Sequence, residues 1–248
     1  KQLSARELVV LAELCALGAA PSEEASEQGP RAEGQQDGGA AARERALQLR
    51  SELYRQAREV PLPDLSRVLA SLHQLLPAEE LKQLLRRCCV RLASDLGDAL
   101  ELESPEGRLR ILSADRLGEV LYVCAACGHK DEGFLEVCRA WLLASDAEAL
   151  HEVSRGVSLV HLLHSLAVFE AARGEVLHAL VAACERRIES FGFFELLGFL
   201  DAAALLQSQA DGPGAAADPE APPASGVGEQ ALGLAVARAC ALLPELDG

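Results

Sequence analysis

The sequence predicts an all-α protein, an α-solenoid of about five antiparallel helix pairs. Leu, Ala, Glu and Arg dominate its 248 residues and only 4% are aromatic, a composition of strong helix formers. Residues 117–127 also align without a gap on residues 159–169, and apolar residues recur at helical spacing in both. This 42-residue offset is typical of repeats whose units bury their apolar faces only against neighbouring units. A globular all-α domain remains the alternative.

The first unit contains a helix at about residues 3–18, for which Ser4 is a suitable N-cap. Residues 19–39 are rich in Gly, Pro, Ser, Glu and Gln, which favours a flexible insertion over a packed element. A second helix is expected at about 40–59. We expect the five units of this single domain, residues 1–248, at about 1–60, 61–110, 111–150, 151–191 and 192–248.

Prolines and caps mark the later helices. Pro61 and Pro63 break the chain, Asp64 caps the helix that follows, and Pro77 suits the first turn of its partner, 78–100. Further helices are expected at about 113–128, 131–148, 157–172 and 174–190, with a last pair beginning near 193 and 229. The Pro-, Gly- and Ala-rich residues 208–228 form a second expected flexible insertion in that pair.

Several classes of function lack their sequence signatures. The formal net charge of −15 argues against a protein that coats nucleic acid along its whole surface. The chain contains no GxxxxGK[ST], GxGxxG or GxSxG motif and no run of about 18 apolar residues. We therefore expect no catalytic residues, no cofactor, no small-molecule substrate and no membrane partner. The chain begins at Lys1 and contains no Met, so we expect it to be a segment of a longer product.

One cysteine motif suggests metal or redox chemistry. Cys124 and Cys127 form a CxxC pair with His129 close behind, a spacing seen in zinc sites. The repeat alignment, however, places Cys124 opposite Leu166 and Cys127 opposite Phe169. Positions that exchange Cys for large apolar residues are core positions. We therefore predict packing roles for these cysteines and no metal site.

Basic residues are concentrated in the second helices of the first two units. Residues 40–58 carry a net charge of +3 and residues 77–96 of +1, whereas residues 131–150 carry −4. This distribution suits phosphate contact at one end of a stack, although solvated helix faces with local ion pairs would give a similar pattern. The candidate RNA-contact residues are Arg43, Arg45, Arg50, Arg55, Arg58, Lys82, Arg86, Arg87 and Arg91.

Two segments carry a family resemblance. Residues 113–135 and 3–18 resemble the units of octotricopeptide and heptatricopeptide repeat proteins, and the helical repeats of FAST-kinase-like, RAP-domain proteins. The resemblance covers most of the chain outside the insertions, but no recognisable RAP domain closes the sequence. It implies an organellar location and RNA binding, RNA processing or membership of a divergent mitochondrial ribosome. The aligned exposed positions show no consistent residue choice, which favours local RNA contact over base-by-base reading.

These observations combine into one expected function. The chain is predicted to be a non-catalytic helical-repeat subunit of a mitochondrial ribonucleoprotein, most simply a divergent mitochondrial ribosome, that contacts rRNA locally and other protein subunits. Its irregularly spaced cysteines favour a reducing or organelle-matrix compartment, so we expect the mitochondrial matrix. Two alternatives remain open: a protein–protein scaffold without RNA contact, and a fragment of an organellar RNA-processing factor.

Overall fold

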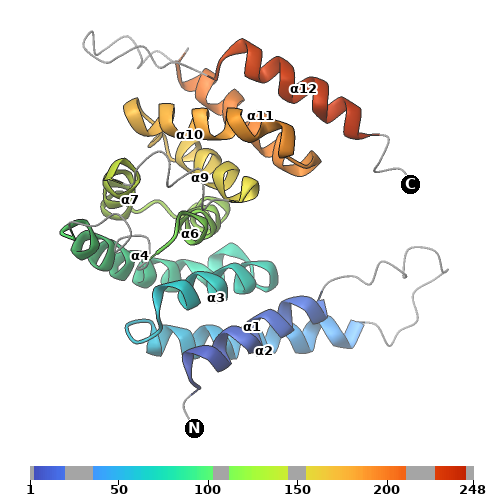
Figure 1. Ribbon diagram of the computed structural model, residues 1–248. Helices are drawn as coiled ribbons and strands as arrows, with labels where there is room; N and C mark the ends of the chain where they lie inside the picture. The colour runs from blue at the N-terminus through green and yellow to red at the C-terminus, as the bar shows by residue number, and fades with distance from the viewer. Residues whose placement is uncertain (1–2, 20–35, 103–111, 145–154, 211–226, 244–248) are drawn as a thin grey trace, which may run out of the picture.

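The computed structural model describes residues 3–19, 36–102, 112–144, 155–210 and 227–243 (Figure 1). These residues form ten α-helices and one short 3-10 helix, with no strand among them, which confirms the predicted all-α class. No helix in this part of the chain is long and apolar enough to cross a membrane. The elements are α1 (Ala5–Ala19), α2 (Gln36–Gln56), α3 (Leu62–Leu75), α4 (Ala78–Leu100), α6 (Ala114–Ala126), α7 (Glu132–Ala144), α9 (Gly156–Val168), α10 (Gly174–Arg187), η3 (Ile188–Ser190), α11 (Phe193–Ala210) and α12 (Glu229–Leu242).

The helices stack in chain order. Figure 1 shows α1 and α2 at one end and α11 and α12 at the other. The first helices of the five units form one row, in which α1, α3, α6, α9 and α11 each pack on the next. Among the second helices, α4 packs on α2 and on α7, and α7 touches α10. Each helix therefore packs mainly against neighbours in the stack.

The third pair departs from a simple hairpin. Helix α6 packs chiefly against α9 and α3, whereas α7 packs chiefly against α4. Helices α6 and α7, which the sequence predicts to pack on each other, instead bury their apolar faces against neighbouring units. This interlocking makes the middle of the stack continuous instead of a series of separable hairpins.

One apolar core runs through the whole stack. Five leucines occupy the same aligned position in successive first helices, and all are fully buried: Leu8, Leu65, Leu117, Leu159 and Leu196. A position that stays buried in every unit is the property expected of a repeat, because each unit uses it to contact the shared core. Residues that are aligned in the sequence therefore occupy equivalent positions in the structure.

Two first helices end in the same way at aligned residues. After α6, the Gly128 backbone is left-handed (φ 61°) and the His129 N–H donates to the Cys124 carbonyl at 2.9 Å. After α9, Glu170 adopts φ 57° and the Ala171 N–H donates to the Leu166 carbonyl at 2.8 Å. This is the Schellman C-cap, which normally favours glycine at its left-handed position. It explains why α9 ends at Val168, before the predicted residue 172.

Both predicted insertions are shorter than their composition suggested. Helix α2 already begins at Gln36, and α11 continues to Ala210, so residues 36–39 and 208–210 are helical. Each residue added to an existing helix gains a hydrogen bond, so a packed helix can extend into a segment that composition assigns to a loop. Ala19 is the last residue of α1, and Val227 is buried just before α12. Residues 20–35 and 211–226 of the two insertions, and residues 145–148 of a predicted helix, lie outside the described residues.

Candidate nucleic-acid interface

The predicted RNA-contact residues all lie on or beside α2 and α4. Helix α2 buries Ala46, Leu49 and Leu53 at helical spacing, and α4 buries Leu81 and Leu85 in the same core. The cations occupy the remaining faces of these two helices, because the apolar stripes take the core-facing positions. Their surroundings nevertheless differ widely and divide them into three groups. The first consists of cations in contacts between α2 and α4, the second of exposed cations with local partners, and the third of exposed cations that have no ion pair with any described residue.

Two of the cations are bound to a single glutamate. The Arg50 guanidinium donates to a Glu80 carboxylate oxygen at 2.8 Å and to the Glu80 backbone carbonyl at 3.0 Å. Arg43 reaches the other carboxylate oxygen of Glu80 at 3.3 Å. Glu80 therefore joins α2 to α4 through two arginines, and Arg50 has a structural role in this arrangement.

Arg91 is the most deeply placed of the candidates. Its guanidinium donates to the backbone carbonyls of Ala57 and Val60, where α2 has ended, and forms an ion pair with Asp95 at 3.0 Å. Only 16% of its side chain is exposed. Arg91 therefore satisfies two backbone carbonyls in the turn between α2 and α3, and it offers little surface to a phosphate.

An aromatic residue joins the same surface. The Arg87 guanidinium lies 4.7 Å above the centre of the Tyr54 ring, a cation–π contact that holds both side chains. Tyr54 is partly exposed and lines a groove of about 610 Å³ between α2 and α4. The groove contains both charges, because Arg50, Arg55, Glu79 and Glu80 all line it. The charges that line the groove therefore balance, and the exposed Tyr54 ring is the part of the groove available for stacking with a base.

The second group consists of exposed cations with local partners. Arg55 forms an ion pair with Glu52, and the Lys82 ammonium lies 2.5 Å from a Glu79 carboxylate oxygen. Because the Arg55 and Lys82 side chains are themselves exposed, their ion pairs contribute only about 0–1 kcal/mol, so these cations can exchange their partners for a phosphate at little cost. The third group, Arg45, Arg58 and Arg86, is exposed and has no ion pair with any described residue.

Sequence reasoning treated the nine cations alike, whereas the structure gives them separate environments. Arg50, Arg87 and Arg91 hold α2 and α4 together, and Arg45, Arg58 and Arg86 remain available to an anion. Sequence reasoning also missed Tyr54. A signal for it existed, because Tyr54 is the lone aromatic residue of an arginine-rich helix.

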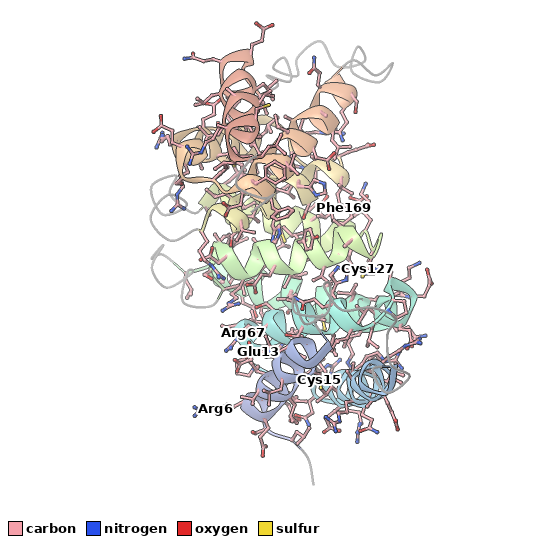
Figure 2. All side chains as sticks on the ribbon, turned by 90° about the vertical axis from the view of Figure 1, so that its right-hand side faces the viewer. Arg6, Glu13, Cys15, Arg67, Cys127 and Phe169 are labelled. Carbon is pink, nitrogen blue, oxygen red and sulfur yellow. The ribbon has the colours of Figure 1, made fainter. Side chains whose placement is uncertain are left out.

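The cysteine motif is buried, as the repeat alignment predicted. Cys124 and Cys127 both lie in the core, and so do the aligned Leu166 and Phe169. Figure 2 places Cys15, Cys127 and Phe169 at successive levels of the stack. The two cysteines of the CxxC pair face different partners, because the Cys124 sulfur lies 3.7 Å from that of Cys89 on α4, while the Cys127 sulfur lies 3.9 Å from His73 Nδ1 on α3.

The surroundings of several other buried thiols suppress their ionisation. Contact with the Cys124 thiol, together with burial, raises the pKa of Cys89 well above its ordinary value. Burial raises the pKa of Cys88 and of Cys184 to about 12. The Cys89 thiol in turn raises the pKa of the His129 imidazole. Among the described residues, no group of three or more His, Cys, Asp or Glu side chains is placed to hold a metal ion.

We expect one thiol to react rapidly in the native protein. All eight cysteines lie in the described ranges, and Cys240 is exposed whereas the other seven are buried. Because the thiolate is the nucleophile, burial slows thiol reagents by limiting access and by raising the pKa. Ellman's reagent should therefore titrate about one thiol per chain quickly and all eight after denaturation. The Cys240→Ser variant should lose the fast phase, and a fast phase of two or more thiols would contradict the buried assignment.

Comparison of the chain with protein-family models, with curated proteins and with solved structures found no match.

Proposed function

We propose that this protein is a non-catalytic helical-repeat subunit of a ribonucleoprotein, and that it contacts RNA locally through the surface formed by α2 and α4. The observation that carries the proposal is the set of exposed arginines Arg45, Arg58 and Arg86, which form no ion pair with any described residue, at one end of an otherwise acidic chain. Unpaired guanidinium groups bind phosphate oxygens without first having to leave another partner.

An aromatic contact between the same two helices supports RNA over other polyanions. Tyr54 presents a ring at the groove between the two helices, and Arg87 holds that ring in place. Stacking of an unpaired base on such a ring, beside cations that take its phosphates, is a common mode of single-strand recognition. The small number of free cations favours an affinity that depends on neighbouring subunits as well as on RNA.

The assembly we propose is mitochondrial, most simply a divergent mitochondrial ribosome in the matrix. This part of the proposal rests on the resemblance of residues 113–135 and 3–18 to organellar helical repeats. Sedimentation of the tagged protein from isolated mitochondria tests it. Nuclease-sensitive migration with ribosomal particles supports the ribonucleoprotein role, whereas migration with a nuclease-resistant complex would favour the protein scaffold.

Charge reversal of the free arginines tests the RNA contact directly. The triple variant Arg45→Glu, Arg58→Glu, Arg86→Glu should bind single-stranded RNA at least about tenfold more weakly at low salt, because each phosphate contact adds to the electrostatic affinity. Fluorescence anisotropy with a labelled oligonucleotide measures the loss. Raising the salt concentration should weaken the unaltered protein more steeply than the variant.

A matched control makes the same charge change elsewhere. Lys130, Arg155 and Arg173 are exposed cations on other parts of the stack, and their replacement by glutamate changes the net charge equally. This control should retain most of the RNA affinity. Equal losses in both triple variants would show a general charge effect and would remove the support for a defined RNA-contact surface.

A further inference from the structure

The first helix of the stack exposes positions that every other unit buries. The residues aligned with Leu11 are Val68, Val120, Leu162 and Phe199, and all four are fully buried. The residues aligned with Leu14 are Ser71, Val123, Ser165 and Ala202, which are also buried. In α1, by contrast, Leu11 is 38% exposed and Leu14 is 58% exposed. Helix α1 thus has apolar residues at the contact positions but no described unit in front of it.

The contacts between interior units identify which face is involved. A β-carbon on Gly118 would meet the Ser158 carbonyl and the Leu162 side chain, so the position of Gly118 faces the following unit and that of Leu162 the preceding one. Further along the same faces, the Tyr122 ring stacks on His161 with centroids 4.1 Å apart.

An ion pair joins the first two units across the same pair of faces. Glu13 of α1 pairs with Arg67 of α3 at 2.6 Å, and Glu13 and Tyr122 occupy aligned positions, as do Arg67 and His161. Figure 2 shows these two side chains next to each other between α1 and α3. The exposed Leu11 and Leu14 therefore lie on the face that elsewhere receives the preceding unit.

The opposite end of the row exposes the complementary face. Leu197 of α11 aligns with Gly118, and the other residues at this position, Val9, Ser66 and Val160, are buried like Gly118. Leu197 is 44% exposed, and Phe194, one turn before it, is exposed still more. Helix α11, the first helix of the last pair, therefore exposes the face that in the other units packs against the following unit.

The charges of the two ends differ. The helices of the first pair, α1 and α2, carry five arginines and five acids and have no net charge, whereas the described residues of the last pair have three acids and one arginine, a net charge of −2. On α11, Asp201 lies one turn beyond Leu197 and is largely exposed, although its carboxylate also lies 2.9 Å from His164 Nε2 of α9. On the exposed face of α1, Arg6 lies one turn before Val10, and Figure 2 shows it projecting away from the stack.

We propose that α11 and α12 of one copy stack head to tail on α1 and α2 of a second copy, with the geometry that joins the interior units. Leu197 then packs against Leu11 and Leu14, as the position of Gly118 packs against Leu162. The contact is heterologous, so each copy keeps one free end and further copies can add. The proposal goes beyond the RNA contact and does not depend on it.

Two charge substitutions test the contact without disturbing the fold, because both side chains are already exposed. We expect the unaltered protein to exceed its chain mass of 26.3 kDa increasingly with concentration, as measured by light scattering after gel filtration. The Leu14→Glu and Leu197→Glu variants should each remain monomeric. An equimolar mixture of the two should form a dimer of twice the chain mass, because each variant retains the end that the other has lost.

The mixing experiment distinguishes this arrangement from a symmetric dimer. If one single variant still dimerises, the contact joins two identical ends and the head-to-tail proposal is wrong. A protein that stays monomeric at every concentration also overturns it, and the exposed face of α1 then belongs to a different protein. Val90→Glu, at an exposed apolar position of α4 outside the first and last pairs, is the matched control and should associate normally. Unchanged circular dichroism establishes that each variant is folded.

Discussion

Replacement of Trp141 by alanine is expected to lower the free energy of unfolding by about 3–5 kcal/mol. Trp141 is the largest fully buried side chain, and it lies on α7, which joins the stack chiefly through α4. Its removal leaves a cavity that neighbouring side chains can fill only in part, so the lost contacts add to the lost transfer energy. The effect should reach beyond α7, because a stack of units depends on each of its interfaces.

Urea denaturation followed by circular dichroism measures this loss, since the variant lacks the chain's single tryptophan as a fluorescent probe. Trp141→Phe keeps most of the buried volume and should lose clearly less stability. Leu143→Ala, at a half-exposed position of the same helix, should change stability by at most about 0.5 kcal/mol. Similar values for Trp141→Ala and Leu143→Ala would show that α7 is not anchored by Trp141.

Replacement of Gly118 by valine is expected to destabilise the protein by about 2–3 kcal/mol, because it overpacks the contact between α6 and α9. A β-carbon at this position would lie 2.9 Å from the Ser158 carbonyl oxygen and 3.3 Å from Leu162 Cγ. The first of these atoms belongs to the backbone, so α9 as a whole would have to move. Differential scanning calorimetry should show a lower melting temperature.

Gly97 provides the matched control for this substitution. It lies within α4, and a β-carbon there would have no neighbour within 4 Å. Because valine and glycine differ little in helix propensity, Gly97→Val should change stability by less than about 0.5 kcal/mol. If Gly118→Val were equally mild, the close approach of α6 to α9 would not be a constraint on the sequence.

The fold class was predictable because it depends on a local and repeated signal. The five aligned leucines from Leu8 to Leu196 recur with helical neighbours, and any such pattern requires a shared apolar core. The pairing of α6 with α7 was not predictable in the same way, since both helices bury their apolar faces on other units. Periodicity identifies which face is buried but not which helix covers it.

The candidate site was predictable only as a group of residues. Charge counting located the basic helices, yet Arg91 and Arg45 look equivalent in the sequence. Their difference arises because the carbonyls of Ala57 and Val60 lie within reach of Arg91, a contact across more than 30 residues of chain. Arg50 similarly meets Glu80 only once α2 and α4 are side by side. The availability of a cation is thus a property of the folded surface.

The contacts of Arg91 and Arg50 make one end of the stack more resistant to local unfolding than the other. Together they fasten α2 to α4 at two separate points. Helix α12 packs on α11 and η3, with Arg238 donating to the Phe191 carbonyl at a longer 3.4 Å. Local unfolding starts where fewest buried contacts must break, so α12 should fray first while the arginine-linked end stays closed. The protein therefore has a firm end at α2 and α4, which carries the RNA-contact candidates, and a looser end at α12.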